Sequence, residues 1–264
     1  MALEKPSAST TVLVTGASSG IGTEMARQLA SRGHGVTLVA RRADRLDSLA
    51  AELSERHKIT ATAIPCDLGD PIARAELIEG LRAGPALAGL CNNAGYGING
   101  RFARNDADRE RQMVELNVVA LHDLTLRALP GMIERGTGAI LNVASTAAFQ
   151  PLPGFATYAA TKAFVLSFSE SLSTELSGTG VSCSALCPGP VKTEFAAVAG
   201  STMSESLPDF AMVSAEEVAR QAIDAMESGN RTAIPGMANQ IQALLGRLAP
   251  RSLVLPLAGR VSKL

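Results

Sequence analysis

The sequence has no tryptophan and only four cysteines in 264 residues. The cysteines are scattered without the CxxC spacing of a zinc site, and so few of them do not suggest a disulfide framework, so we expect reduced, buried thiols and no metal. No apolar run approaches the roughly 18 residues that span a bilayer. The first ten residues also lack the charged and apolar regions of a secretory signal. These absences favour a cytoplasmic protein.

An excess of charge of one sign is also lacking. The formal net charge is -1 and no long basic run is present, which argues against a nucleic-acid surface. Hydrophobic residues make up 46% and charged residues 19% of the chain, as is typical of globular proteins. A single domain over residues 1–264 is therefore the simplest expectation. The final Ser262-Lys263-Leu264 matches a peroxisomal address, which we interpret as a coincidence.

Strand and helix patterns alternate from the N-terminus, as β-branched runs take turns with segments of helical leucine spacing. Strands are predicted at 11–15, 36–40, 60–65, 87–92, 139–144 and 181–186, and helices at 21–31, 43–55, 72–81, 109–129 and 158–177. This alternation predicts an α/β fold, a single Rossmann-like doubly wound parallel sheet with helices on both faces. Its ligand site is expected at the carboxyl ends of the strands.

The pattern changes after the last of these strands. Residues 194–212 are rich in small and polar side chains and are predicted to form a substrate loop. A helix at 214–228 opens with a capping signature, Ser214 followed by Glu217. The apolar tail at 237–264 is interrupted by two prolines and is predicted to form two short helices packed on the body. A surface that meets a partner or a membrane is the alternative for this tail.

A glycine-rich stretch, Thr15–Gly22, follows the first predicted strand and opens the first helix. Glycines let the backbone turn sharply and approach a pyrophosphate, and the helix N-terminus offers free N–H groups. The spacing departs from the common GxGxxG form, so this is a variant of the dinucleotide fingerprint, and a purely structural turn is the alternative. The predicted cofactor-binding residues of this loop are Gly16, Ser18, Ser19, Gly20, Ile21 and Gly22.

Two arginines, Arg41 and Arg42, follow the second predicted strand. An NAD enzyme is expected to have an acid here that bonds the ribose 2′-hydroxyl, whereas arginine suits the 2′-phosphate of NADP. Ser18 is within reach of the same phosphate, and a solvated arginine pair at a helix entry is the alternative. The pattern favours NADP(H) as the cofactor. Candidates for its adenosine half, at the third and fourth strand ends, are Asp67, Leu68, Asn93, Ala94 and Gly95.

Tyr158 and Lys162 lie four residues apart in a predicted helix and therefore share one face. A free tyrosine has a pKa of about 10. Because a nearby ammonium favours the phenolate, Lys162 is expected to lower the pKa of Tyr158 and suit it to general acid/base catalysis. Ser145, at a strand end, can donate a hydrogen bond to a substrate oxygen. Asn117 is a candidate for holding a water that passes protons on from Lys162.

In their order and spacing these motifs resemble the short-chain dehydrogenase/reductase family. The matching residues, between residue 11 and about 195, are Thr15–Gly22, Asn92–Gly95, Asn117, Ser145, Tyr158, Lys162, Pro188-Gly189 and Thr193. The resemblance implies a catalytic tetrad of Asn117, Ser145, Tyr158 and Lys162. It also implies that Tyr158 and Lys162 bind the cofactor, and that Lys162 bonds the nicotinamide ribose. The residues implied to flank the nicotinamide are Pro188, Gly189, Val191 and Thr193.

The implied activity is NADP(H)-dependent hydride transfer between nicotinamide and a carbonyl or secondary alcohol, with Tyr158 as general acid/base. Carbonyl reduction is the expected direction, since cells usually keep NADP reduced. An NAD-dependent alcohol dehydrogenase, which the arginines disfavour, and a non-catalytic NADP-binding regulator, which the intact tetrad disfavours, are the alternatives. The resemblance also implies a homodimer or homotetramer, packed through the fourth and fifth predicted helices.

Apolar side chains in three stretches, 96–102, 146–155 and 194–212, favour a small hydrophobic carbonyl or alcohol substrate. The side chains predicted to select it are Ile98, Phe102, Phe149, Leu152, Phe155, Phe195 and Phe210.

Overall fold

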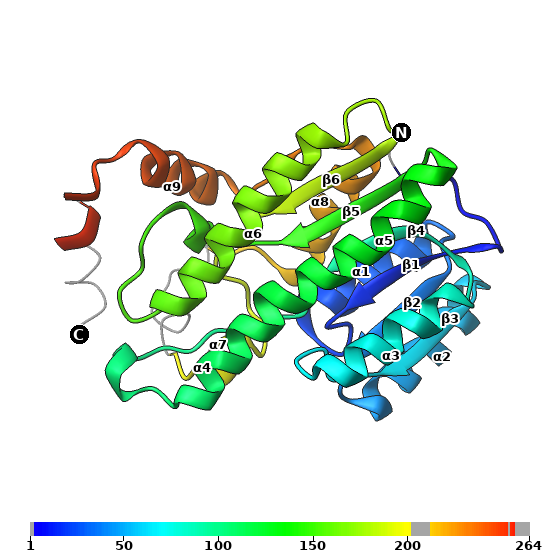
Figure 1. Cartoon of the computed structure of the whole chain (residues 1–264), viewed down its shortest axis with the longest axis horizontal. Coiled ribbons are helices and arrows are strands. Elements are labelled where there is room, and N and C mark those ends of the chain that lie inside the picture. The colour runs from blue at the N-terminus through cyan, green and yellow to red at the C-terminus, as the bar shows by residue number, and fades with distance from the viewer. Residues whose placement is uncertain (1–2, 202–211, 253, 257–264) are drawn as a thin grey trace.

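The computed structural model describes residues 3–201, 212–252 and 254–256, in which strands and helices alternate (Figure 1). The strands are β1 (Thr10–Thr15), β2 (Val36–Ala40), β3 (Ala61–Pro65), β4 (Ala86–Asn92), β5 (Gly138–Val143), β6 (Val181–Leu186) and β7 (Thr232–Ala233). The helices are α1 (Gly20–Ser31), α2 (Ala43–His57), α3 (Pro71–Arg82), α4 (Ala107–Val114), α5 (Leu121–Arg135), α6 (Ala156–Glu175), α7 (Phe195–Ala199), α8 (Ala215–Ser228) and α9 (Met237–Leu248). Two 3₁₀ turns, η1 (Phe102–Arg104) and η3 (Thr146–Phe149), and a π turn, η2 (Glu115–Ala120), complete them.

These strands form one parallel sheet in the order β3-β2-β1-β4-β5-β6-β7. At its centre Val14 of β1 pairs with Leu38 of β2 on one side and with Cys91 of β4 on the other. The chain winds outward in one direction from β1 to β3 and in the other from β4 to β7. The loops that follow β1 and β4 therefore diverge at a topological switch point, where ligands bind in sheets of this kind.

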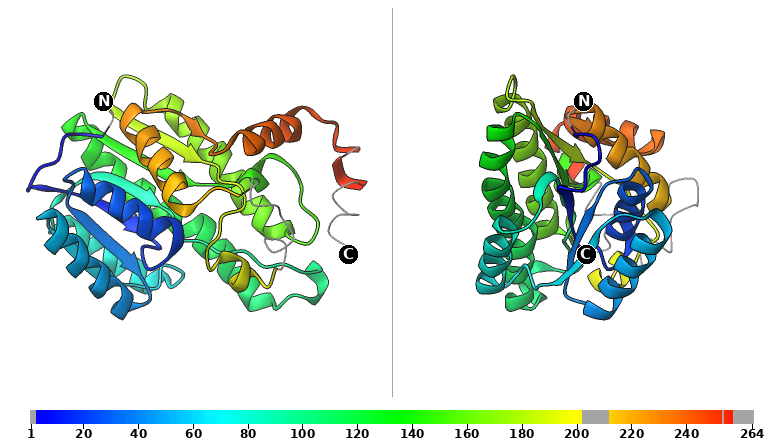
Figure 2. Two further views of the ribbon diagram at one scale, coloured as in Figure 1. Left: turned by 180° about the vertical axis from the view of Figure 1, so that it is seen from behind. Right: turned by 90° about the vertical axis from the view of Figure 1, so that its right-hand side faces the viewer.

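Both faces of the sheet are covered by helices, because successive strand residues point to opposite sides. Val12 and Val14 pack in one core with α1, α2 and α8, whereas Leu13, between them, packs in the other with α3, α5 and α6. The right-hand view of Figure 2 shows the sheet between these two helix layers. The predicted α/β fold, a parallel sheet with helices on both faces, is confirmed.

The bounds of most elements follow local signals in the sequence. The helix predicted to end at residue 55 continues to His57, and Lys58 ends it with φ +56°. The long helix predicted at 109–129 is α4, η2 and α5 in succession, and it ends at Gly136 with φ +67°. Ser214 caps α8 by accepting a hydrogen bond from the Glu217 N–H at 3.2 Å, as the capping signature predicts.

The apolar tail packs on the body only in part. Ala243 of α9 is buried in a cluster with Phe149, Val165 and Leu166, and in Figure 1 α9 lies beyond the end of the sheet. The exposed apolar side chains of α9 are Met237, Ile241, Leu244, Leu245 and Leu248. The last three residues, with the peroxisomal match, lie outside the described ranges. No helix in those ranges has the length and apolar character that crossing a membrane requires.

Candidate active site

A cavity of about 580 Å³ opens at the carboxyl edge of the sheet. Its walls come from the segments that follow β1 to β6, which are far apart in the sequence. Gly22 and Asn117 are buried and do not line it. All other predicted catalytic and cofactor residues do: Gly16, Ser18, Ser19, Gly20, Ile21, Arg41, Arg42, Asp67, Leu68, Asn93, Ala94, Gly95, Ser145, Tyr158, Lys162, Pro188, Gly189, Val191 and Thr193.

The glycine-rich loop connects β1 to α1 along the floor of this cavity. Gly16 and Gly20 have φ values of +66° and +58°, which side-chain-bearing residues rarely adopt. A side chain at Gly22 would collide with the carbonyl oxygen of Gly16, so the first turn of α1 can approach the loop only with glycine there. The N-cap residue, Ser19, makes no capping hydrogen bond through its side chain. The N–H groups of the first turn are thus available to an anion.

The segment after β4 is fixed to the end of β1 by Thr15. The Thr15 hydroxyl accepts hydrogen bonds from the N–H groups of Asn93 at 2.9 Å and Ala94 at 3.0 Å, and the Asn93 amide donates to the Thr15 carbonyl at 2.9 Å. A side chain at Gly95 would come within 2.9 Å of Asn117 Oδ1 and 3.4 Å of Lys162 Nζ. The glycine therefore lets the cofactor segment lie directly against the candidate catalytic residues.

Asn117 sits in the π turn η2, and its side chain is bonded to protein groups of two other segments. Its amide donates to the Tyr96 carbonyl at 2.9 Å and to the Thr161 hydroxyl at 3.1 Å, and its Oδ1 accepts from the Tyr96 N–H at 3.1 Å. Thr161 was not predicted, because nothing in its sequence context marks it as a partner of a residue 44 positions away. These bonds hold the segment after β4 against α6.

Ser145, Tyr158 and Lys162 converge on one end of the cavity. Tyr158 and Lys162 share a face of α6, with Nζ 5.8 Å from the centre of the tyrosine ring. Lys162 Nζ donates to the Val143 carbonyl at the end of β5 at 2.7 Å. The Ser145 hydroxyl accepts from the Ala147 N–H at 3.1 Å, donates to the Pro188 carbonyl at 3.5 Å, and is in hydrogen-bond contact with Tyr158. All three catalytic candidates are buried.

The predicted lowering of the Tyr158 pKa by Lys162 is wrong for the protein itself. Burial raises the pKa of Tyr158 to about 12, and the hydrogen bond with Ser145 only partly offsets it. Burial also lowers the pKa of Lys162 from its usual 10.5 to about 8, so its ammonium is a weaker source of positive charge than the sequence suggests. Near neutral pH Tyr158 therefore carries its proton, which is the form that a general acid requires.

Burial of the Lys162 ammonium should make the stability of the protein depend on pH. Because folding lowers its pKa, the unfolded chain binds more protons above pH 8, and stability contributed through Lys162 rises with pH until about pH 10. We expect Lys162→Met to be more stable relative to the wild type at pH 7 than at pH 10. Between about pH 8 and pH 10 the free energy of unfolding of the wild type should rise relative to that of Lys162→Met by about 1 kcal/mol per pH unit. Urea unfolding of both proteins at several pH values measures these free energies. A difference between the two that does not vary with pH would contradict the prediction.

Ser18, Arg41 and Arg42 form the corner of the cavity next to β2. Arg42 donates from Nε and Nη2 to the Ser18 hydroxyl at 3.1 and 3.0 Å. Its Nη1 donates to Glu194 at 2.8 Å, and Arg45 donates to the same carboxylate at 2.8 Å. Sequence analysis missed Glu194 as a partner of this corner, although it directly follows a candidate cofactor residue. The corner offers several N–H donors and a hydroxyl to an anionic oxygen.

Three of the apolar side chains predicted to select the substrate line the cavity, namely Leu152, Phe155 and Phe195. The Phe195 ring lies 5.3 Å from that of Tyr158, and Phe155 lies 6.0 Å from it. Ile98 packs against the cluster that contains Phe155 and Tyr158 but does not line the cavity, and Phe102 is 66% exposed and does not line it either. Phe210 lies outside the described residues. The apolar wall of the cavity therefore lies directly beside the ring of Tyr158.

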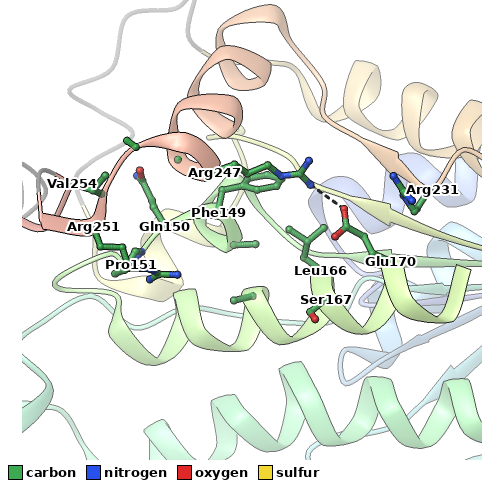
Figure 3. Close-up of a pocket in the computed structure, with 14 residues that line it drawn as sticks. Phe149, Gln150, Pro151, Leu166, Ser167, Glu170, Arg231, Arg247, Arg251 and Val254 are labelled. Atoms are coloured by element: carbon green, nitrogen blue, oxygen red, sulfur yellow. Dashed lines mark hydrogen bonds and ion pairs between the residues drawn. The ribbon is translucent and has the colours of Figure 1, made fainter. Parts of the chain in front are cut away.

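Phe149 faces a different cavity, of about 590 Å³, between η3, α6 and α9 (Figure 3). There the guanidinium of Arg247 lies 4.8 Å from the centre of the Phe149 ring and forms an ion pair with Glu170 at 2.9 Å. The prediction that Phe149 helps to select the substrate is therefore wrong, because Phe149 packs against the tail and does not line the catalytic cavity. Another tail residue, Asn239, lies against Gly189, where any side chain would collide with it.

Comparison with known proteins gives consistent matches. Residues 10–204 match the short chain dehydrogenase family. Sulfoacetaldehyde reductase 2 of Chromohalobacter salexigens is 38% identical over 71% of this chain and 75% of its own length. The structure of a short-chain dehydrogenase from Sphingobium yanoikuyae in complex with NADPH is 36% identical, with a TM-score of 0.82 over 94% of this chain and 95% of that one. The bulky-bulky ketone specific alcohol dehydrogenase from Comamonas testosteroni is 32% identical, with a TM-score of 0.77 over 96% and 94% of the two chains.

Proposed function

The chain belongs to the short-chain dehydrogenase/reductase family of oxidoreductases, and we propose that it is an NADP(H)-dependent carbonyl reductase in which Tyr158 supplies the proton. One observation carries the proposal. The buried set of Ser145, Tyr158 and Lys162 shares a single cavity with the Ser18–Arg42 corner, so one extended dinucleotide can reach both ends. The relative from Sphingobium yanoikuyae, which is described in complex with NADPH, supports the choice of cofactor.

The residues around the cavity fit NADP(H). The first turn of α1 would offer N–H groups to the pyrophosphate, and Ser18 with Arg42 would offer donors to the 2′-phosphate. Lys162 lies beside Gly95 and would bond the nicotinamide ribose, as the family resemblance implies. When bound, the cofactor would supply a hydride to the substrate carbon. No cluster of metal-binding side chains occurs within the described ranges.

The protein's own residues handle the substrate oxygen. Ser145 and Tyr158 both present hydroxyl groups at the end of β5 and can bond the same carbonyl oxygen. As the carbonyl carbon accepts hydride, the oxygen gains negative charge and takes the Tyr158 proton, which leaves an alcohol and a phenolate. Lys162 Nζ lies 5.8 Å from the centre of the Tyr158 ring, so we infer that its ammonium stabilises the phenolate. We also infer that a proton returns to Tyr158 past Lys162 and Asn117, in the role that the family resemblance implies for Asn117.

The substrate we propose is a small hydrophobic ketone or aldehyde. Leu152, Phe155 and Phe195 make the wall beside Tyr158 apolar, and such a wall favours a substrate with few charged groups. The similar Comamonas testosteroni enzyme, named for its specificity for bulky-bulky ketones, supports a ketone as the substrate class but not its small size.

A panel assay tests the function. Purified protein is mixed with NADPH or NADH and a series of aryl ketones, cyclic ketones and aliphatic aldehydes, and cofactor oxidation is followed by absorbance. We expect turnover with NADPH and at least one hydrophobic carbonyl, and much slower turnover with NADH. Faster reaction with NADH would favour the alternative of an NAD-dependent alcohol dehydrogenase. Tight NADPH binding without any turnover would favour a non-catalytic regulator.

We also propose that the chain forms a homodimer or homotetramer through α5 and α6. Leu126 and Ile133 of α5 are 54% and 44% exposed, and Phe164 of α6, stacked on Phe168, is 39% exposed. Apolar side chains left open on neighbouring helices are typical of interfaces. Light scattering at micromolar concentration should give a mass at least twice that of one chain, and a monomer would contradict the proposal.

A further inference from the structure

The carboxylate of Glu194 is held by two arginines, Arg42 of the NADP(H) corner and Arg45 of α2, which does not line the cavity. Its Oε2 accepts from Arg42 at 2.8 Å, and its Oε1 accepts from Arg45 at 2.8 Å. The two guanidinium groups hold the pKa of Glu194 at about 2, so the side chain is an anion at neutral pH. Glu194 thus presents two anionic oxygens to the donors that would otherwise serve a phosphate.

The guanidinium of Arg42 donates hydrogen bonds to two partners. Its Nε and Nη2 point to the Ser18 hydroxyl, and its remaining nitrogen, Nη1, points to Glu194. A guanidinium binds phosphate through two parallel N–H groups. A phosphate that binds Arg42 end-on would use Nη1 and Nη2, and Nη1 is the nitrogen that Glu194 holds. In this mode Glu194 and the 2′-phosphate compete for the same donor.

We propose that Glu194 is an internal substitute for the 2′-phosphate, which NADP(H) must displace from Arg42 and Arg45, and that this exchange sets the preference for NADPH over NADH. The inference rests on the proposed assignment of the Ser18–Arg42 corner. NADH has no group that competes for the arginines, so its binding leaves the Glu194 bridges in place. NADPH binding breaks the Glu194 ion pairs, and its 2′-phosphate, with about two negative charges, forms new bonds to the arginines.

The exposure of these groups makes the exchange feasible. The side chains of Arg42, Arg45 and Glu194 are 39%, 46% and 47% exposed. Ion pairs this open to solvent are weak and break readily. A dianion can consequently replace the carboxylate, although the bridges must still lower the apparent affinity for NADPH.

Glu194 also connects this corner to the substrate wall. It is the N-cap residue of α7, and the next residue, Phe195, lies 5.3 Å from the ring of Tyr158. The Glu194 carbonyl accepts the Val198 N–H at 3.0 Å, so the residue is part of the helix backbone. Displacing its side chain by the 2′-phosphate would break the ion pairs that tie the start of α7 to Arg42 and Arg45, and Phe195 of α7 lines the cavity beside Tyr158.

The test is a fluorescence titration of the full-length protein with NADPH and, separately, NADH. For Glu194→Gln we expect NADPH to bind about three- to tenfold more tightly, the size of one or two exposed ion pairs. NADH affinity should change by less than about twofold, because no bridge is broken when it binds. Glu79→Gln is the matched control, since Glu79 also pairs with an exposed arginine, Arg82, but does not line the cavity.

A double-mutant cycle with Arg42→Ala separates this inference from the assignment on which it rests. The gain from Glu194→Gln should be smaller in the Arg42→Ala background, because part of the competition is already gone. If Arg42→Ala weakens NADPH binding but Glu194→Gln leaves it unchanged, the competition is wrong and the cofactor corner stands. If Glu194→Gln weakens NADPH and NADH alike, Glu194 holds bound cofactor in place, and the inference is overturned. If Arg42→Ala has no effect on NADPH, the corner itself is misassigned.

Discussion

Tyr158→Phe is expected to lower kcat for carbonyl reduction by about 10²- to 10⁴-fold, the range that general acid catalysis contributes. The variant removes only the hydroxyl, so the ring keeps its contacts with Phe155 and Phe195. Burial keeps the hydroxyl of the wild type protonated at neutral pH, so the variant loses the group that we propose as the acid. NADPH affinity should change little, because the hydroxyl is proposed to act on the substrate oxygen.

The chain offers a matched control, since it has two tyrosines in all. Tyr96 also lines the cavity, but its hydroxyl donates to the Arg109 carbonyl at 2.7 Å and is half-exposed. Steady-state rates for Tyr96→Phe should therefore stay within a few-fold of the wild type. A Tyr158→Phe variant that binds NADPH normally and retains more than about a tenth of the wild-type kcat would exclude Tyr158 as the proton donor.

The second large effect concerns the arginines after β2. Replacing Arg41 and Arg42 together by alanine should weaken NADPH binding by about 10- to 100-fold, because hydrogen bonds to a charged group contribute about 1.5–3 kcal/mol each. Arg42 should account for most of the loss, since its guanidinium is already fixed on Ser18, whereas Arg41 lines the cavity from an exposed position. NADH lacks the 2′-phosphate, so its affinity should remain within about threefold of the wild type.

Titration of both cofactors into the wild type, each single variant and the double variant measures this effect. Arg82→Ala serves as a control, because Arg82 is an exposed arginine of α3 whose partner is Glu79. Equal losses of NADPH and NADH affinity would show that the arginines shape the pocket without recognising a phosphate. No loss at all would leave the reductive direction without its main support.

Most of the fold could be predicted because its signals are local. The β-branched strands and the leucine spacing of helices such as α2 depend on residues a few positions apart, and they set an alternation that only a parallel sheet satisfies. The short elements α7 and β7 lack such signals. Two residues, Thr232 and Ala233, form β7 only because β6 lies beside them, with Ala185 in register. Tertiary contact, and not sequence pattern, makes that strand.

The site divides in the same way. The glycine-rich loop, Tyr158 and Lys162 could be found because their chemistry requires particular residue types at fixed spacing. The pKa of Tyr158 could not, because it depends on how deeply the fold buries the ring. Similarly, nothing near Phe149 in the sequence shows that Arg247 of α9 will cover it. Pairings across many residues, such as Glu194 with Arg42, appear only once the chain is folded.

The proposal that this chain reduces carbonyls with NADPH is tested most directly by following the hydride itself. NADPH carrying deuterium at C4, prepared separately with the label on each face of the ring, is incubated with the protein and a ketone found in the panel assay. The expected result is one deuterium on the carbinol carbon of the product from one of the two labelled cofactors, and none from the other. An alcohol without deuterium from either cofactor, or no alcohol from any carbonyl tested, would contradict the proposed function.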